Sequence, residues 1–286
     1  MILLVGVPGN VGSPLLEELL ARKAEVRVLV HNADRVGQFK ERGLDVVIGD
    51  MSDPQSLAAA LAGVDKVFFL SPAVAEKIEL ETALVDAARA AGNPHMVKIS
   101  ALGADRESIG DFMSQHGEVE AYVLASGVPY TFLRPNLFMQ NLVPFYGQSI
   151  AATGMYYVSA GDARIGWVDA RDIAAVAARV LLEPGHEGKA YPITGPETLS
   201  YNDVAAKLST LLGKPVQYVP VSDEVAYQSM VAAGMPEWNA HAVVTLNKFY
   251  RMGGGDVVER TVKQITGQEP RNMEAYLREN LAGFGG

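Results

Sequence analysis

The chain contains no cysteine among its 286 residues. Disulfide bonds, thiolate nucleophiles and cysteine-ligated metal or iron–sulfur sites are therefore excluded, and the absence fits a reducing compartment. No apolar run approaches the roughly 18–20 residues that a membrane span needs. Basic residues are also scarce, with 24 Lys and Arg against 33 Asp and Glu and a formal charge of −9. This balance argues against nucleic acid and anionic membrane surfaces as partners, because both attract basic faces.

Several catalytic motifs are missing as well. None of the eleven tyrosines is followed by a lysine four residues later, so the Tyr–Lys pair that moves a proton in ordinary alcohol–ketone dehydrogenases is absent. The five histidines lack His-x-x-x-His spacing, and we expect no metal site. Neither a Gly-x-Ser-x-Gly elbow nor a P-loop occurs. Because the chain enters an apolar run without a basic, signal-like segment, we expect a cytoplasmic protein.

Three glycines follow the first apolar run of the sequence. Residues 1–5 fit a buried strand that stops at Gly6, Gly9 comes next, and leucines at helical spacing begin after Gly12. Glycine permits positive φ and lets the backbone approach a ligand without a Cβ in the way. The N-terminus of the following helix offers free N–H groups and the positive end of a dipole. A strand, a glycine turn and a helix in this order predict a dinucleotide-binding cradle.

Strand-like and helix-like segments alternate through the first half of the chain. The expected strands after the first are 26–30, 45–50, 66–71 and 96–100, and helical spacing covers 56–61 and 79–91. This alternation predicts an α/β fold with a Rossmann-like, doubly wound parallel sheet. Gly6, Asp50, Ser71 and Ser100 all fall at the carboxyl ends of these strands, where such sheets bind ligands. We therefore expect them to converge on one crevice.

The pattern changes near residue 140, where glycine, tyrosine and proline become frequent. Helical segments are expected at 170–182, 200–213 and 222–234. We predict a dinucleotide-binding domain over residues 1–140 and a smaller, partly helical C-terminal lobe over 141–286, with some later segments returning to the first domain. The glycine-rich tail, residues 282–286, is expected to be loosely packed.

Several segments resemble the NmrA-like branch of the atypical short-chain dehydrogenases/reductases. They are Gly6-x-x-Gly9-x-x-Gly12 and the segments 49–54, 127–135, 168–174 and 185–191, and their order and spacing extend over roughly residues 1–250. Within that branch the chain is most similar to type 2 NAD(P)H:quinone oxidoreductases, triphenylmethane reductases and related azoreductases. The resemblance implies NADP(H) bound by the Rossmann part, with substrate between it and the C-terminal lobe.

Two positions depart from this family pattern. Pro8 stands in the glycine loop where the family commonly has threonine, and it can donate neither N–H nor hydroxyl to a phosphate. The cradle must then rely on N–H groups such as those of Asn10 and Val11. At the end of the second strand, His31 stands where relatives often carry arginine.

The same region bears on which dinucleotide is bound. An NAD-preferring site usually has an acidic residue at the end of the second strand, but His31 and Asn32 occupy that place. His31, Asn32 and Arg35 have the charge and the donors to hold a 2′-phosphate, so NADP(H) is favoured over NAD(H). The alternative is that Arg35 is only a solvated residue at a helix start, and Asp34 would oppose a phosphate if it turned inward.

The resemblance also places further residues beside the cofactor. Asp50 and Met51 are expected near the adenine, although Asp50 has the alternative of only stabilising the turn before Pro54. The segment Ser71-Pro72-Ala73 is expected to border the ribose and pyrophosphate. The full set expected to hold the cofactor is Gly6, Val7, Pro8, Gly9, Asn10, Val11, Gly12, His31, Asn32, Arg35, Asp50, Met51, Leu70, Ser71, Pro72, Ala73, Ser100, Pro135, Asn136 and Phe138.

His116 is the candidate catalytic residue. With Glu120 it resembles the His-x-x-x-Glu of the quinone and dye reductases, and the i, i+4 spacing places both on one helix face. His116 is expected to bond the nicotinamide ribose or the substrate, and to supply a proton. The alternative is an ordinary surface or packing histidine.

The segment after Pro135 is expected to pass the nicotinamide and the substrate opening. By resemblance, Phe138 and Met139 provide an apolar face for a flat acceptor, while Asn136 and Gln140 bond the carboxamide. The alternative is a strand exit with one buried aromatic. Five further aromatic residues either join this pocket or form the core of the lobe: Phe145, Tyr146, Tyr156, Tyr157 and Trp167.

These observations predict an NADPH-dependent reductase that transfers hydride to a quinone-, triarylmethane- or azo-type acceptor without flavin or metal. Such acceptors demand positioning more than a strong general acid, which fits the missing Tyr–Lys pair. The alternative is a non-catalytic, NAD(P)-binding redox sensor of the NmrA type that acts through a protein partner. The oligomeric state is left open, with a homodimer as one possibility.

Overall fold

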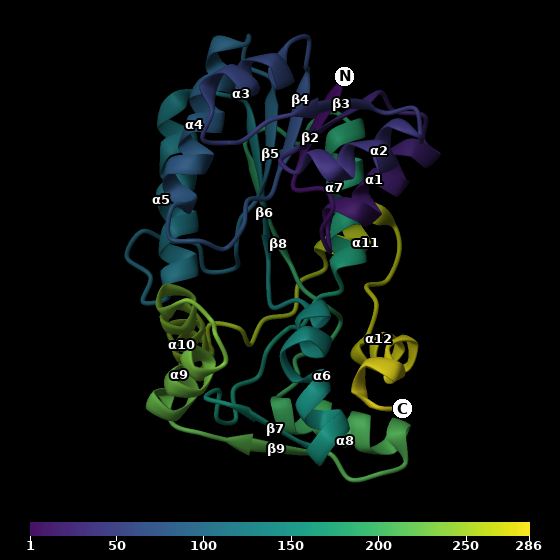
Figure 1. Cartoon of the computed structure of the whole chain (residues 1–286), viewed down its shortest axis with the longest axis vertical. Coiled ribbons are helices and arrows are strands. Elements are labelled where there is room, and N and C mark those ends of the chain that lie inside the picture. The colour runs from purple at the N-terminus through teal and green to yellow at the C-terminus, as the bar shows by residue number, and fades with distance from the viewer.

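The computed structural model describes all residues from 1 to 286 and is built around one parallel sheet (Figure 1). The strand order is β3-β2-β1-β4-β5-β6-β8, and every neighbouring pair is parallel. The order reverses between β1 and β4, which is the point where an open α/β sheet binds ligands. The strands are β1 (Ile2–Val5), β2 (Val26–Val30), β3 (Asp45–Ile48), β4 (Lys66–Phe69), β5 (His95–Ile99), β6 (Tyr130–Pro135) and β8 (Lys189–Ile193).

Helices cover both faces of the sheet, as Figure 1 shows. One face packs against α1 (Gly12–Ala21), α2 (Val36–Lys40), α7 (Ala170–Leu182) and α11 (Thr261–Thr266), and the other against α3 (Pro54–Leu61), α4 (Lys77–Ala90) and α5 (Asp111–Ser126). The division follows the alternation of side chains along each strand. Leu4 and Val97 lie in the core under α1 and α7, whereas Leu3 and Met96 lie in the core under α3 to α5.

A second, smaller part lies beyond the carboxyl ends of the strands (Figure 1). It contains a two-stranded parallel sheet of β7 (Met155–Val158) and β9 (Gln217–Pro220). Its helices are α6 (Leu142–Thr153), α8 (Tyr201–Leu212), α9 (Asp223–Ala232), α10 (Glu237–Arg251) and α12 (Met273–Glu279). Short 3-10 turns occur at η1 (Ala33–Arg35), η2 (Met139–Asn141) and η3 (Leu281–Phe284).

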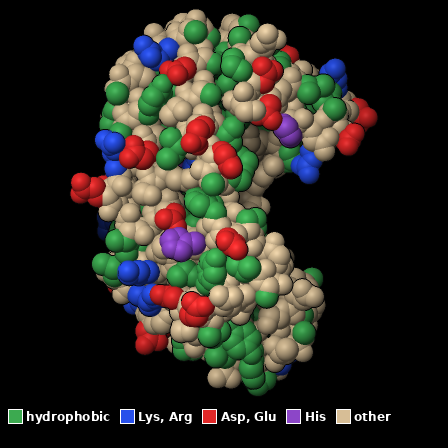
Figure 2. All heavy atoms as spheres, turned by 60° about the vertical axis from the view of Figure 1, so that its left-hand side comes forward, with side chains coloured by type: hydrophobic (Ala, Val, Ile, Leu, Met, Phe, Trp, Pro, Cys, Tyr) green, Lys and Arg blue, Asp and Glu red, His purple; other side chains and the backbone are tan.

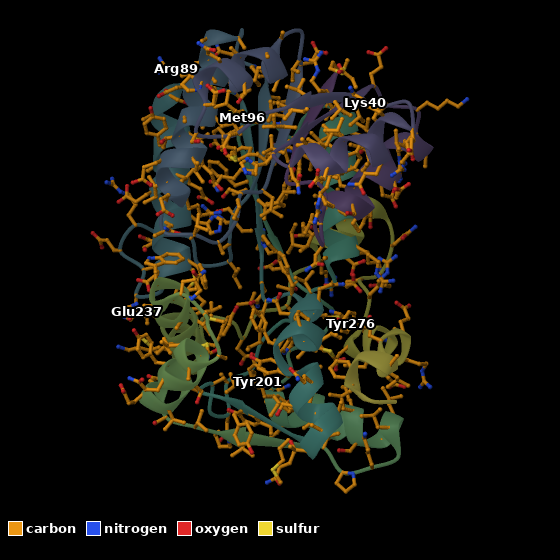
Figure 3. All side chains as sticks on the ribbon, in the orientation of Figure 1. Lys40, Arg89, Met96, Tyr201, Glu237 and Tyr276 are labelled. Atoms are coloured by element: carbon orange, nitrogen blue, oxygen red, sulfur yellow. The ribbon has the colours of Figure 1, made fainter.

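The lobe has its own aromatic core. Tyr156, Trp167 and Tyr201 are almost fully buried there, and Trp167 and Tyr201 pack edge to face with ring centroids 5.1 Å apart. Tyr156 and Trp167 thus follow the lobe-core alternative rather than an open aromatic pocket. Figure 3 labels Tyr201 in this core and Met96 in the core under α4 and α5.

The predicted α/β Rossmann-like architecture is confirmed. The chain returns to the main sheet after residue 140, because β8 pairs with β6 and α7 packs on α1. The expectation of a loose tail is wrong: Phe284 is fully buried in the lobe core, and Lys214 donates to the Gly285 carbonyl. None of the helices has both the length and the apolar character needed to cross a bilayer.

Candidate functional site

The glycine turn between β1 and α1 is tightly packed. Gly6 has a φ of +102°, and a Cβ there would lie 2.5 Å from the Leu70 carbonyl oxygen on the neighbouring strand end. A Cβ on Gly12 would lie 2.4 Å from the Gly6 carbonyl oxygen, and one on Gly9 3.0 Å from the same atom. All three positions therefore require glycine or a shifted backbone.

The turn presents free hydrogen-bond donors at the start of α1. The Gly9 N–H is bonded to the Ser13 hydroxyl at 3.3 Å, but the N–H groups of Asn10, Val11 and Gly12 have no acceptor within the chain. No acidic side chain lies in the first turn of α1. Unpaired N–H groups together with the helix dipole form an anion-binding site. These donors suit a pyrophosphate, and the proline at position 8 does not remove them.

The ends of β2 and β3 meet beside the turn. His31 is 80% exposed, and its Nδ1 lies 2.9 Å from an Asp50 carboxylate oxygen. Asp50 also accepts from the N–H and hydroxyl of Ser52, both at 2.7 Å. These hydrogen bonds, with His31 adding to them, hold the pKa of Asp50 below its ordinary value. Asp50 therefore stabilises the turn before Pro54, as the alternative to an adenine contact predicts, and it also contacts His31 at the end of β2.

Asn32 and Arg35 lie in the same exposed segment. The Asn32 side chain accepts from the Asp34 N–H at 2.8 Å and so caps η1. Arg35 is exposed and takes part in no ion pair. No other element covers this guanidinium, so it is available to an anionic group at the carboxyl edge of the sheet.

A hollow separates the sheet-bearing part from the lobe, as the space-filling view shows at one side of the molecule (Figure 2). A cavity of about 380 Å³ opens between the glycine turn and the lobe. It is lined by Asn10, Gln140, Val143, Arg171, Tyr276, Glu279 and Asn280. Figure 3 shows the labelled Tyr276 on α12, on the side of the lobe that faces α6. The glycine turn and the segment after β6 therefore face one cleft.

Of the segment after β6, Gln140 lines this cavity and Met139 does not. Met139 is 1% exposed and packs in the lobe core with Trp167, so the prediction that its side chain faces an acceptor is wrong. Its N–H is bonded to the Val168 carbonyl oxygen at 2.9 Å. Gln140 donates to Asp169 and accepts from the Ala170 N–H, both at 2.9 Å.

Asn136 has a structural role in this segment. It is 4% exposed, its amide donates to the Gly255 carbonyl oxygen at 2.9 Å, and its own oxygen accepts from the Leu137 N–H. These contacts tie the end of β6 to the chain after α10, and they leave little of the amide for a nicotinamide. Phe138 is half-buried against the core under α7.

The remaining predicted residues divide into core and surface. Val7, Met51 and Pro135 are buried, and Leu70 is partly buried against the core under α1. Pro72 and Ala73 are exposed beyond β4. The Ala73 carbonyl oxygen accepts from Asn239 of α10 at 2.7 Å, which joins this loop to the lobe.

His116 and Glu120 of α5 contact residues at the carboxyl ends of β5 and β6. His116 Nδ1 lies 3.2 Å from the Nζ of Lys98 on β5. Burial, together with repulsion from Lys98 and Lys77, holds the pKa of His116 well below its ordinary value, so the ring is neutral at neutral pH. Glu120 accepts from the Ser100 hydroxyl at 2.5 Å and is paired with Arg134.

A buried charged cluster behind His116 escaped the sequence reasoning. Lys77, Glu81 and Lys98 are at most 3% exposed. Glu81 is paired with Lys98 and lies 2.9 Å from Lys77, while the Ser71 hydroxyl donates to Glu81 and accepts from Lys77, both at 2.6 Å. Ser71 therefore serves this cluster with its side chain. The one available signal was the lysine inside the apolar strand of residues 95–99.

Comparisons with known proteins agree with this geometry. The model of the NmrA-like family matches residues 1–277. The NAD(P)H azoreductase of Xenophilus azovorans is 40% identical over 288 residues, which cover 100% of this chain and 99% of that protein. The solved NADPH complex of the NADPH-dependent quinone oxidoreductase QOR2 from Escherichia coli matches with a TM-score of 0.91 at 26% identity. The match covers 98% of this chain and 100% of that one.

A third match is the triphenylmethane reductase of Citrobacter sp. in complex with NADP(H). It has a TM-score of 0.87 at 28% identity and covers 96% of this chain and 98% of that one. The family model and the azoreductase both extend over nearly the whole sequence. The resemblance seen in the sequence motifs is thereby confirmed: this chain belongs to the NmrA-like family.

Proposed function

We propose that this protein is an NADPH-dependent reductase that delivers hydride to a flat aromatic acceptor of the azo, quinone or triarylmethane type. The observation that carries the proposal is the glycine turn with three unpaired N–H groups at the carboxyl edge of the sheet, facing the cleft. The azoreductase, quinone oxidoreductase and triphenylmethane reductase matches support the acceptor class.

In this proposal, each part of NADPH is held by different residues around the turn. The N–H groups of Asn10, Val11 and Gly12 are the donors for the pyrophosphate, and Arg35 with His31 faces the 2′-phosphate. A bound NADPH supplies the hydride and is itself the only redox group needed. The absence of an acidic side chain directly after β2 favours NADPH over NADH.

Replacing Arg35 with alanine tests this cofactor preference. A charge-assisted hydrogen bond contributes about 1.5–3 kcal/mol, so we expect the KM for NADPH to rise roughly 10- to 100-fold while the KM for NADH hardly changes. The matched control is Arg89→Ala, an exposed arginine at the far end of α4 in Figure 3. Equal effects of Arg35→Ala on both cofactors would place the 2′-phosphate elsewhere.

The acceptor site has no Tyr–Lys pair, and this fits acceptors that are electrophilic on their own. A triarylmethane cation needs only hydride, whereas a quinone or an azo group also takes up a proton. The chain's contribution is therefore to hold the acceptor against the nicotinamide in a cleft and to provide a donor near its heteroatom. His116, neutral and partly buried on α5, is the candidate for that donor.

The reductase proposal is tested by NADPH oxidation with an acceptor panel. Purified protein without added flavin is mixed with a benzoquinone, a triarylmethane dye or an azo dye, with NADPH and NADH in parallel. We expect acceptor-dependent oxidation that is faster with NADPH. Tight cofactor binding without turnover of any acceptor would instead support the redox-sensing regulator.

A further inference from the structure

The cluster behind His116 holds an uncompensated positive charge inside the protein. Lys77 and Lys98 both approach the single carboxylate of Glu81, and none of the three side chains is more than 3% exposed. Burying an ionised group is costly unless it is fully paired. Two ammonium groups with one carboxylate leave a net charge of about +1 in a region of low effective dielectric constant.

The other charged groups around Lys98 do not remove this excess. Glu120 of α5 is the nearest further carboxylate, but it is paired with Arg134 of β6 and bonded to Ser100. The titratable groups near Lys98 are therefore Lys77 and Glu81 from α4 and His116 and Glu120 from α5, and Arg134 of β6 is paired with Glu120. Burial and Lys77 lower the pKa of Lys98 to about 8, and Glu81 limits the fall.

The geometry also determines which nitrogen of His116 carries the proton. An ammonium group has only donors, so Nδ1, 3.2 Å from the Lys98 nitrogen, is the acceptor and Nε2 bears the hydrogen. Nε2 has no partner within the chain, yet it is not among the fully enclosed unpaired nitrogens and oxygens. Nε2 therefore keeps some accessible surface and is free to donate its hydrogen to a bound acceptor.

We propose that Lys98 and His116 form a proton relay that serves acceptors whose reduction requires a proton, an inference that rests on the proposed reductase function. An acceptor that gains a hydride carries a negative charge on its oxygen or nitrogen. That atom takes the proton from His116 Nε2, Nδ1 takes one from Lys98, and Lys98 becomes a neutral amine. Electrons enter only with the hydride, and the proton is restored from water by the reverse path through His116.

The charge balance of the cluster favours this direction. Before the transfer the cluster of Lys77, Glu81 and Lys98 carries +1, and afterwards Lys77 and Glu81 form a neutral pair. Imidazole alone cannot give up its Nε2 proton near neutral pH, because it would become an anion; the proton from Lys98 removes that obstacle. In this account His116 contacts the acceptor, and Lys98 acts through it.

The first test uses NMR of protein labelled with ¹⁵N in histidine and lysine, and needs no turnover. His116 is assigned by its loss in a His116→Gln variant. We expect His116 to be the Nε2–H tautomer. The ¹⁵N chemical shift of its Nδ1 should change with pH as Lys98 titrates near pH 8. In Lys77→Gln the excess charge is gone, and this titration should move to higher pH. A His116 that titrates at its ordinary pKa, or a Lys98 titration unmoved by Lys77→Gln, would overturn the relay.

The second test is the pH dependence of kcat with a benzoquinone. The relay needs Lys98 protonated, so activity should fall above pH 8, and in Lys77→Gln this fall should move to higher pH. In Lys98→Arg the fall of activity above pH 8 should vanish, and kcat should be lowered about 100-fold or more. The reason is that a guanidinium group keeps the charge but releases no proton. An unchanged profile in both variants would refute the relay while leaving the reductase intact.

A triarylmethane dye cation provides an internal control. It becomes neutral on receiving hydride and needs no proton, so the loss of activity in Lys98→Arg should be much smaller with the dye than with the quinone. An equal loss of activity with dye and quinone would show that Lys98 acts only on the structure of the site. If no acceptor is reduced at all, the reductase function fails, and the NMR titrations still decide whether Lys98 and His116 are coupled.

Discussion

Replacing Gly12 with alanine is expected to weaken NADPH binding about 100-fold or more. The new Cβ would lie 2.4 Å from the Gly6 carbonyl oxygen and 3.0 Å from a Val7 methyl carbon. Backbone atoms have no rotamer to change, so α1 must move away from the turn and take the N–H groups of Asn10 and Val11 with it. Losing two or more charge-assisted hydrogen bonds, each contributing about 1.5–3 kcal/mol, weakens binding about 100-fold or more.

The measurement is a calorimetric titration with NADPH, accompanied by circular dichroism to establish that the variant is folded. Gly37→Ala is the matched control, because Gly37 lies in α2 with open space around the position of a Cβ and without a positive φ. Alanine there should leave affinity unchanged and favour the helix slightly. Normal NADPH affinity in a folded Gly12→Ala protein would show that the cofactor is not held by this turn.

Replacing Glu81 with glutamine is expected to cause the largest loss of stability. The side chain is fully buried between two lysines. Removing one partner of a buried ion pair costs about 3–5 kcal/mol, because it leaves the other charge uncompensated. The free energy of unfolding from urea titration measures the loss. Glu18→Gln, which breaks an exposed i, i+4 pair with Arg22, should change it by no more than about 0.5 kcal/mol.

The loss in Glu81→Gln should also depend on pH. Without the carboxylate, the pKa of Lys98 falls further in the folded state, whereas in the unfolded chain it returns to about 10.4. The folded variant then binds fewer protons than the unfolded one, so its stability rises with pH. The deficit relative to wild type should therefore shrink from pH 6 to pH 8, and adding Lys98→Met should recover part of it. A pH-independent deficit would show that the lysines are not responsible.

The sequence was most informative where the signal is local. An apolar run, a glycine turn and leucines at helical spacing are contained within about twenty residues, and β1, the turn and α1 form as predicted. The strands β2, β4 and β5 likewise follow from short apolar runs that fit buried strands. The family motifs add the expectation of a cofactor between the two parts of the molecule, and the comparisons confirm the family.

Features that depend on how distant segments pack were missed. Glu81 and Lys98 form an ion pair only when α4 lies against β5, and the spacing of apolar residues along the sequence does not predict such a pair. The burial of Met139 depends on its packing against Trp167 and other residues of the lobe core, which come from later parts of the chain. The tail looks mobile by composition, but Phe284 has a pocket in that core. In each case tertiary packing outweighed the local preference.

A single-turnover reaction measures whether this protein transfers hydride from NADPH to a quinone. Wild-type protein in excess over NADPH is mixed with a benzoquinone in the absence of oxygen and flavin, and both reactants are followed by absorbance. We expect NADPH and quinone to disappear at the same rate and in equal amounts, and Gly12→Ala to slow the reaction strongly. Bound NADPH that persists unchanged in the presence of quinone, azo dye and triarylmethane dye would contradict the proposed hydride transfer.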